Sequence, residues 1–260
     1  MTAARNEPAV ALRRLLPEAG HLTADEAAAQ LRFCDWAPAD RPYVAVNMVA
    51  TVDGRASVSG RTAPISSVAD RQLFHALRTR VDAILVGAGT LRTERYGRLV
   101  RDPHRREQRV AAGLDADPVA IVVSGRLDLP ADLPLLQDAA SRVIVVTAAQ
   151  TPLPDCAAQV SYVRSAPVDL GAALAQVRAE HGVRSILCEG GPRLNASLFA
   201  AGLADELFLT TYPTLAGGAG ALTIIGDAPL PDPLDVRMQW LLECDGELFA
   251  RYRLDERPGG

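Results

Sequence analysis

The chain has 260 residues, of which 48% are hydrophobic and 22% charged, and its formal net charge at pH 7 is −4. These values are typical of a soluble globular enzyme, and the scattered basic residues offer no footprint for nucleic acid or an anionic membrane. Because no apolar run approaches the ~20 residues that span a bilayer and no signal-peptide pattern opens the chain, we expect a cytoplasmic protein.

The first 40 residues are expected to form an accessory helical segment, 1–40, that packs on a main domain at 41–258. Thr23 and Asp25 can cap a helix that continues to Phe33, and the prolines that follow would end it. No repeat or low-complexity linker divides the rest, so one large domain is expected.

The main domain opens with an apolar, β-branched run at 43–49, which predicts a strand. A helix is predicted from about Ser67 to Thr79, because Ser67 and Asp70 have the spacing of a capping box and apolar residues recur at helical intervals. This helix leads into a second apolar run at 83–86.

Alternating strands and helices are predicted in the middle of the chain. Beyond a polar loop expected at about 95–117, apolar runs at 119–123 and 143–146 predict strands that are covered on both faces. A helix at about 169–180 then precedes a short apolar strand at 185–188. This alternation favours a mostly parallel sheet.

The last part of the chain is richer in strands. A helix at about 192–201 is followed by predicted strands at 205–212, 236–244 and 248–254, and Asp245-Gly246 marks a hairpin. We therefore predict an α/β fold: a mixed, mostly parallel central sheet flanked by helices, with an antiparallel C-terminal hairpin.

The cysteines and histidines give no sign of a metal centre or a nucleophile. Cys34, Cys156, Cys188 and Cys244 form no Cys-x-x-Cys pair and have no histidine at metal-ligand spacing. We expect no metal site and four reduced thiols. None of the four histidines is an evident catalytic base, and no Gly-x-Ser-x-Gly motif is present.

Two junctions carry the strongest functional signal, since each runs from an apolar strand through glycines into a helix. At such a place glycine lets the backbone approach a ligand, and the free N–H groups of the helix start attract anions. Each alone is a weak signal, because neither matches a dinucleotide fingerprint or a P-loop. Together they indicate a ligand with separated phosphates. Their residues are Gly87, Ala88, Gly89 and Thr90, and Glu189, Gly190, Gly191 and Pro192.

Four stretches, read in order, resemble the dihydrofolate-reductase-like pyrimidine reductases of riboflavin biosynthesis. They are Asn47 to Gly54, which ends in Thr-Val-Asp-Gly, then 81–91, 186–192, and 202–207 followed by 213–218. The resemblance covers most of residues 43 to 220 and is specific in combination. It implies a dihydrofolate-reductase-like fold, a homodimer, and NADPH as the cofactor.

By this resemblance, the two junctions would hold the diphosphate of NADPH, and Ser124 would touch its adenosine half. NADPH is expected rather than NADH because the family uses it; Arg126 is a candidate contact for the 2′-phosphate, or a solvated surface arginine. The expected cofactor-binding residues are Gly87, Ala88, Gly89, Thr90, Glu94, Ser124, Glu189, Gly190, Gly191, Pro192 and Arg193.

The substrate side is expected on the first strand, where Asn47, Val49, Thr51 and Asp53 could bind a pyrimidine or pteridine ring. Asp53, Asn47 and Glu94 are the candidate catalytic residues, although Asp53 before Gly54 is also a typical turn residue. The implied reaction is hydride transfer to C1′ of 5-amino-6-(5-phosphoribosylamino)uracil.

Two departures from the family leave the substrate open. Many members have lysine where Asn47 stands, and many have Asp-Asp-Pro where this chain has Glu94-Arg95-Tyr96. A dihydrofolate or other pterin reductase on the same fold is therefore an alternative, as is a non-catalytic NADPH-binding protein. The zinc deaminase motif that often accompanies these reductases is missing from the sequence.

Overall fold

The computed structural model describes residues 8–218, 222–226 and 230–255. Its helices are α1 (Ala24–Ala29), α2 (Val68–Leu77), α3 (Ala88–Glu94), α4 (Pro103–Ala111), α5 (Leu170–His181) and α6 (Pro192–Ala200), with 3-10 turns at Ala63–Ile65 and Arg78–Arg80. Its strands are β1 (Ala11–Leu16), β2 (Gly20–Thr23), β3 (Tyr43–Thr51), β4 (Ala83–Gly87), β5 (Val119–Val123), β6 (Arg142–Thr147), β7 (Gln159–Arg164), β8 (Ser185–Cys188), β9 (Glu206–Tyr212), β10 (Val236–Cys244) and β11 (Glu247–Leu254).

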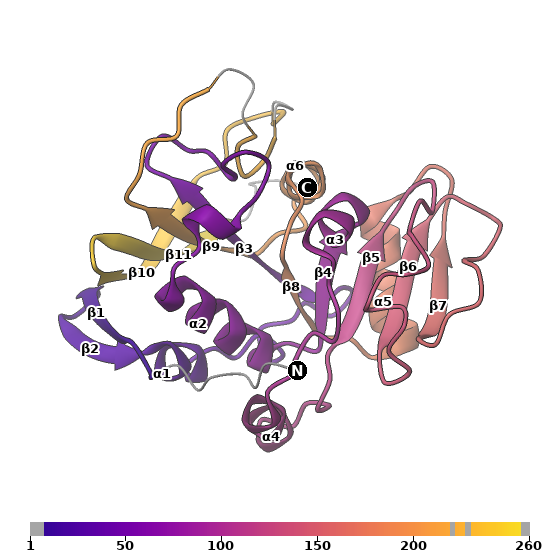
Figure 1. Cartoon of the computed structure of the whole chain (residues 1–260), viewed down its shortest axis with the longest axis horizontal. Coiled ribbons are helices and arrows are strands. Elements are labelled where there is room, and N and C mark those ends of the chain that lie inside the picture. The colour runs from indigo at the N-terminus through magenta and orange to yellow at the C-terminus, as the bar shows by residue number, and fades with distance from the viewer. Residues whose placement is uncertain (1–7, 219–221, 227–229, 256–260) are drawn as a thin grey trace.

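The strands form one mixed sheet in the order β2-β1-β10-β11-β9-β3-β8-β4-β5-β6-β7 (Figure 1). The pairs from β9 through β3, β8, β4, β5 and β6 to β7 are parallel, whereas β2, β1, β10, β11 and β9 pair antiparallel. Asp245 and Gly246 have φ of 49° and 80° at the β10–β11 turn, as a tight hairpin requires. The predicted mixed sheet with a C-terminal hairpin is confirmed.

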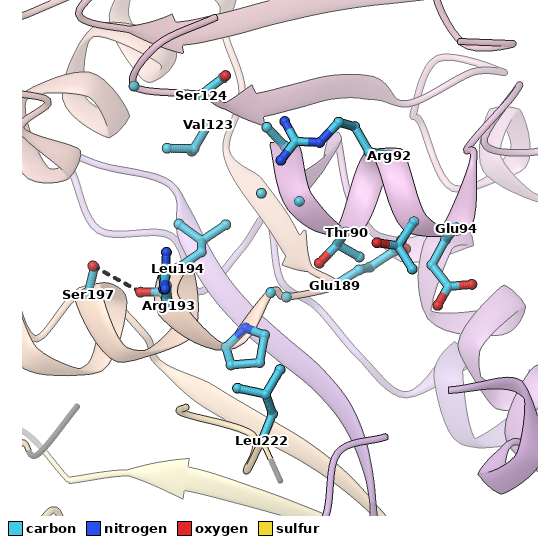
Figure 2. Close-up of a pocket in the computed structure, with 18 of the residues that line it drawn as sticks. Thr90, Arg92, Glu94, Val123, Ser124, Glu189, Arg193, Leu194, Ser197 and Leu222 are labelled. Atoms are coloured by element: carbon cyan, nitrogen blue, oxygen red, sulfur yellow. Dashed lines mark hydrogen bonds between the residues drawn. The ribbon is translucent and has the colours of Figure 1, made fainter. Parts of the chain in front are cut away.

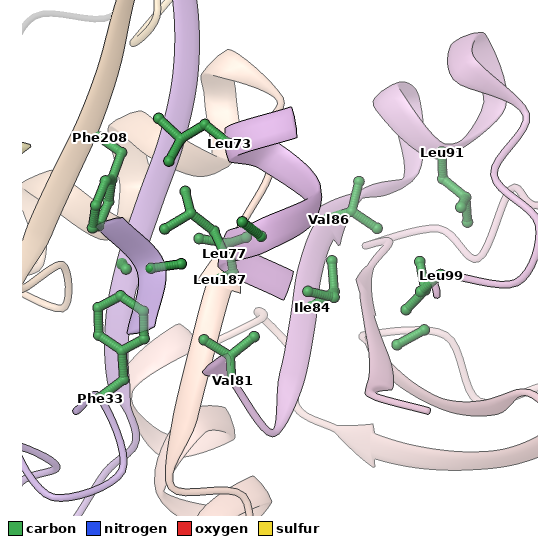
Figure 3. Close-up of a cluster of buried hydrophobic side chains, with 14 of the residues drawn as sticks. Phe33, Leu73, Leu77, Val81, Ile84, Val86, Leu91, Leu99, Leu187 and Phe208 are labelled. Carbon is green, nitrogen blue, oxygen red and sulfur yellow. The ribbon is translucent and has the colours of Figure 1, made fainter. Parts of the chain in front are cut away.

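Helices cover both faces of the sheet because the central strands are apolar on both sides. On β4, Ile84 and Val86 pack in the core that includes α1 and α2, while Ala83 and Leu85 pack in the core that includes α5 and α6. Figure 3 shows the first of these cores, with Leu77 of α2 close to the side chains of the central strands. The central strands are therefore buried on both faces.

The N-terminal segment is more than a helix. The predicted cap at Thr23 is confirmed, and Thr23 forms a complete capping box with Glu26. However, α1 ends at Ala29, and two strands precede it, of which β1 pairs with β10 and so extends the main sheet. The segment is therefore joined to the sheet by backbone hydrogen bonds. Residues 1–7 and 256–260, at the outer ends of the two expected parts, lie outside the described residues.

A helix, α4, interrupts the stretch that was expected to be a polar loop, so that expectation is wrong. Asp102 caps α4 by accepting a hydrogen bond from the N–H of His104, and Pro103 occupies its first turn. The helix lacks an apolar stripe, and its buried residue is Arg109, which is fully buried. Apolar periodicity therefore could not reveal it.

The other predicted helices are confirmed, at α2, α5 and α6. At α2 only half of the expected capping box forms: the hydroxyl of Ser67 accepts from the N–H of Asp70, whereas the Asp70 carboxylate accepts from the hydroxyl of Ser66.

All four cysteines are free thiols, with Cys188 buried and the others half-buried. Among the described residues, no helix is long and apolar enough to cross a bilayer.

Candidate active site

The two glycine junctions lie side by side, because β4 and β8 are neighbouring parallel strands that end at the same edge of the sheet. The N–H of Gly87 donates to the carbonyl oxygen of Gly190 at 2.9 Å, and the N–H of Glu189 donates to the carbonyl oxygen of Leu85 at 2.9 Å. The peptide bond between Gly190 and Gly191 is cis. Two segments far apart in the sequence thus form one surface.

The helices that start at the junctions leave their first N–H groups without a side-chain cap. α3 begins after Gly87 and α6 after Gly191, and neither has a capping side chain. The other four α-helices in the described parts of the chain are all capped, by Thr23, Ser67, Asp102 or Asp169. Uncapped helix starts that face one cavity are suited to binding anionic groups.

The glycines provide the space that such a ligand needs. A Cβ atom on Gly191 would lie 2.9 Å from the Thr90 hydroxyl oxygen, so a side chain at this position must displace a neighbour. A Cβ on Gly89 would meet nothing within 4 Å, which leaves the backbone of α3 open to the cavity. The residues present therefore fit the diphosphate of a dinucleotide cofactor.

A cavity of about 1290 Å³ lies over the junctions (Figure 2). Typical small-molecule sites occupy roughly 300–1,000 Å³, so there is room for an extended cofactor and a second ligand. All eleven expected cofactor-binding residues line it, and Arg126 does as well. These lining residues are Gly87, Ala88, Gly89, Thr90, Glu94, Ser124, Arg126, Glu189, Gly190, Gly191, Pro192 and Arg193.

The expected substrate residues on β3 are not among those that line the cavity. Instead Met48 lines it, and because side chains alternate along a strand, Asn47 and Val49 lie on the opposite face of β3. Thr51 and Asp53 lie at the end of the strand, where the Thr51 hydroxyl donates to the Asp53 carboxylate at 2.5 Å. The sequence predicted the strand itself but could not show which of its two faces meets the cavity.

Asp53 holds a neighbouring loop. Its carboxylate accepts hydrogen bonds from the N–H groups of Ala216 at 3.1 Å and Gly217 at 2.7 Å. The bonds from Thr51, Ala216 and Gly217 lower the pKa of Asp53 to about 2. Asp53 is therefore ionised at neutral pH.

Glu189 lines the cavity, but its carboxylate is bound by the protein. The guanidinium of Arg78 donates to both of its oxygens, at 2.6 and 2.7 Å, and the Glu189 side chain is only 1% exposed. Sequence reasoning missed Arg78, since nothing in a helix-ending Arg-Thr-Arg indicates a partner more than 100 residues away.

Further lining residues were missed because they come from loops. The segment after β3 contributes Ala56, Ser57, Gly60 and Thr62, and the hydroxyl of Thr62 donates to the Glu94 carboxylate at 2.9 Å. The start of α5 contributes Asp169 to Gly171. The Asp169 capping signal predicted that helix, but not that its start faces the same cavity.

Comparison with known proteins identifies the family. Residues 42–246 match the model of the RibD C-terminal domain. The chain is 31% identical over 219 residues to the 2,5-diamino-6-ribosylamino-4(3H)-pyrimidinone 5′-phosphate reductase of Methanothermobacter thermautotrophicus, covering 82% of this chain and 98% of that protein. It is 30% identical over 216 residues to the enzyme of the same name from Archaeoglobus fulgidus, covering 81% of this chain and 90% of that protein.

A solved structure has the same fold. The pyrimidine reductase-like protein from Corynebacterium diphtheriae superposes with a TM-score of 0.70 at 22% identity, covering 90% of this chain and 100% of that one. The family match spans most of the chain and contains both glycine junctions. The chain therefore belongs to the RibD C-terminal domain family.

Proposed function

We propose that this protein is an NADPH-dependent reductase of a ribosylamino-pyrimidine phosphate in riboflavin biosynthesis. The observation that carries the proposal is the joined pair of uncapped, glycine-lined junctions over one large cavity. The names of the two reductases described above support the reductase activity and the pyrimidine substrate.

The cofactor that this proposal names is NADPH, which supplies a hydride when bound. The N–H groups at the starts of α3 and α6 would bind its diphosphate, and Ser124 would contact its adenosine half. Arg126 lines that end of the cavity, and its guanidinium makes no hydrogen bond or ion pair with any residue that the structure describes. An unpaired guanidinium supports recognition of the 2′-phosphate that distinguishes NADPH from NADH.

The pyrimidine would lie at the opposite end of the cavity, beside Met48, Ser57, Thr62, Glu94 and Leu222. Glu94 is held there by Thr62, so its carboxylate can orient a ring N–H or amino group. Asp53 is too acidic to donate a proton at neutral pH. Its contribution to catalysis would be to fix the 216–217 loop, which precedes the cavity-lining Leu222 in the chain.

We propose that three of the expected substrate residues affect substrate binding only indirectly; they are Asn47, Val49 and Thr51. Met48 lies between Asn47 and Val49 on β3 and lines the cavity, so a change at either neighbour can alter the position of Met48. Thr51 acts on Asp53 through its hydroxyl. Indirect effects on substrate binding are therefore what we propose for all three.

Two pyrimidines are candidates. The family resemblance implied 5-amino-6-(5-phosphoribosylamino)uracil, whereas the two relatives above are named for the 2,5-diamino-pyrimidinone, which carries an amino group in place of the uracil C2 oxygen. We propose the diamino compound as the preferred substrate. Oxidation of NADPH by purified protein should be measured with each pyrimidine and with dihydrofolate.

The assay separates the alternatives. Faster NADPH oxidation with the diamino compound supports the proposal, and preference for the uracil reverses the substrate assignment. Oxidation with dihydrofolate alone would establish a pterin reductase instead. NADPH binding without oxidation by any of them would leave a non-catalytic NADPH-binding protein.

The proposal also includes a cytoplasmic homodimer. Val236, Met238 and Leu248 are 45%, 38% and 36% exposed on β10 and β11, and such apolar side chains could pack against a second copy. Because these strands lie inside the sheet, that contact would use the face of the sheet rather than its edge. Light scattering after size exclusion would give the mass of the assembly, and a monomeric mass would refute the dimer.

A further inference from the structure

We infer that Arg78 is a positioning residue that sets the spacing of the two glycine junctions without reaching the cavity itself. The inference deepens the proposed cofactor site and rests on it. Arg78 is not among the described residues that line the cavity. Its effect on a bound cofactor would therefore pass through the groups that its side chain holds.

The first of these groups is the carboxylate of Glu189, at the head of the second junction. Arg78 Nε and Nη2 donate to its two oxygens at 2.6 and 2.7 Å, and the two side chains are only 8% and 1% exposed. A bidentate pair of this kind fixes orientation as well as distance. With the Glu189 N–H also bound to Leu85, the residue is fixed through both its backbone and its side chain.

The fixed Glu189 is followed by two glycines, which have no side chains to anchor them. Gly190 has φ of +87°, a conformation that other residues rarely adopt. Its carbonyl oxygen accepts from Gly87, so the position of Glu189 decides where the second junction meets the first. An anchor immediately before a glycine pair therefore controls the shape of the surface that the two junctions form.

The second group held by Arg78 belongs to the segment that follows the first junction. Nη1 donates to the carbonyl oxygen of Leu99 at 2.6 Å, and the guanidinium lies 5.5 Å from the ring centre of Tyr96. Both residues follow α3, which starts at the first junction. One guanidinium thus binds a residue of the second junction and the segment that follows the first.

Arg78 is itself held in place by α4. Arg109, which is fully buried, donates to the carbonyl oxygens of Arg78 and Val81. The backbone of Arg78 is therefore fixed from one side and its side chain from the other. This contact gives the unexpected polar helix α4 a role in supporting the site.

The test compares two matched variants of the full chain, Glu189→Gln and Glu206→Gln. Each carboxylate is 1% exposed and is bound by one arginine, Glu206 by Arg251, but Glu206 is not among the described cavity-lining residues. Amide hydrogen exchange of the protein alone should rise in peptides spanning 85–91 and 186–195 for Glu189→Gln only. The Kd for NADPH, measured well below the melting temperature, should rise about ten-fold or more for Glu189→Gln only.

Two further variants separate positioning by Arg78 from direct contact by Glu189. Arg78→Met should weaken NADPH binding as Glu189→Gln does, and Arg78→Lys should give an intermediate Kd, because an ammonium cannot reproduce the planar fork. A wild-type Kd and wild-type exchange in Arg78→Lys and Glu189→Gln would overturn the inference. If the wild-type chain fails to bind NADPH, the proposed function fails, while the exchange comparison still decides whether Arg78 sets the junctions.

Discussion

The N–H of Gly87 donates to the carbonyl oxygen of Gly190 at 2.9 Å, and this bond makes one structure out of two glycine junctions. The starts of α3 and α6 open beside it without side-chain caps. A ligand with two linked phosphates can therefore meet N–H donors from both helices at once. The predictions below test the parts of this arrangement separately.

Gly191→Val should weaken NADPH binding by about 100-fold or more while the far-ultraviolet circular dichroism stays unchanged. Gly191 has φ of −54°, which other residues adopt readily, but a Cβ there would lie 2.9 Å from the Thr90 hydroxyl oxygen. Isothermal titration with NADPH would measure the loss. An unchanged Kd would remove this loop from the site.

A control for that prediction distinguishes loss of the space for the ligand from a steric clash with Thr90. Gly191→Ala combined with Thr90→Ala removes the hydroxyl that the new Cβ would meet. We expect the double variant to bind NADPH as weakly as Gly191→Ala alone, because the methyl group still occupies ligand space. Full recovery in the double variant would show that Thr90, and not the ligand, is what the side chain displaces.

Asp53→Asn should leave the Kd for NADPH unchanged and lower kcat/KM for the pyrimidine by about ten-fold. The asparagine keeps one acceptor oxygen but loses the charge that strengthens the bonds from Ala216 and Gly217. Steady-state kinetics with saturating NADPH would measure the effect. Unaffected turnover would reduce Asp53 to a turn residue.

Arg126→Gln should raise the KM for NADPH about ten-fold or more and leave the KM for NADH unchanged, because only NADPH carries the 2′-phosphate. Arg193→Gln is a useful comparison, since Arg193 also lines the cavity but lies at the start of α6. We expect Arg193→Gln to weaken both cofactors alike. Equal loss of both cofactors in Arg126→Gln would contradict the assignment.

Stability should fall with rising pH because of Glu247. Burial raises its pKa to about 7, with Asp70 and Asp245 contributing and the Ser67 hydroxyl opposing; its second oxygen is buried and has no hydrogen-bond partner among the described residues. The folded state thus binds a proton more tightly than the unfolded state. Protonated Glu247 therefore contributes about 2 kcal/mol to the free energy of unfolding. This contribution is complete below about pH 4.5 and is lost as the pH rises through 7.

Urea unfolding between pH 5 and pH 8, with Glu247→Gln as the comparison, would measure this dependence. In the variant, the free energy of unfolding should no longer fall between pH 5 and pH 8 as it does in the wild-type chain. The variant should also be the more stable protein at pH 8. If the two chains have parallel pH profiles, Glu247 does not titrate in this range.

The central strands and the glycine junctions could be predicted because their signals are local. Apolar runs covered on both faces and glycine between strand and helix mark β4 and β8 directly in the sequence. α4 gave no such signal, because it packs through the guanidinium of Arg109 and not through an apolar stripe. The pairing of β1 with β10 joins distant parts of the chain, and no local pattern encodes it.

The cavity-lining residues were predicted better at the glycine junctions than on β3, for a similar reason. Backbone N–H groups and glycines bind phosphate wherever the junction lies, so the junction residues could be named individually. The substrate side depends on which face of β3 each residue occupies, and there Met48 faces the cavity between Asn47 and Val49. Glu189 lines the cavity, but its carboxylate belongs to a contact with Arg78 that only the folded chain reveals.

The central claim is that the two junctions hold NADPH for hydride transfer to the pyrimidine substrate. It is tested most directly with NADPH that carries deuterium at both positions of C4 of the nicotinamide, incubated with purified protein and the diamino-pyrimidinone phosphate. The account predicts a reduced product with one deuterium at C1′ of its sugar chain, detected by mass spectrometry. NADPH that binds but transfers no deuterium to the pyrimidine would contradict it.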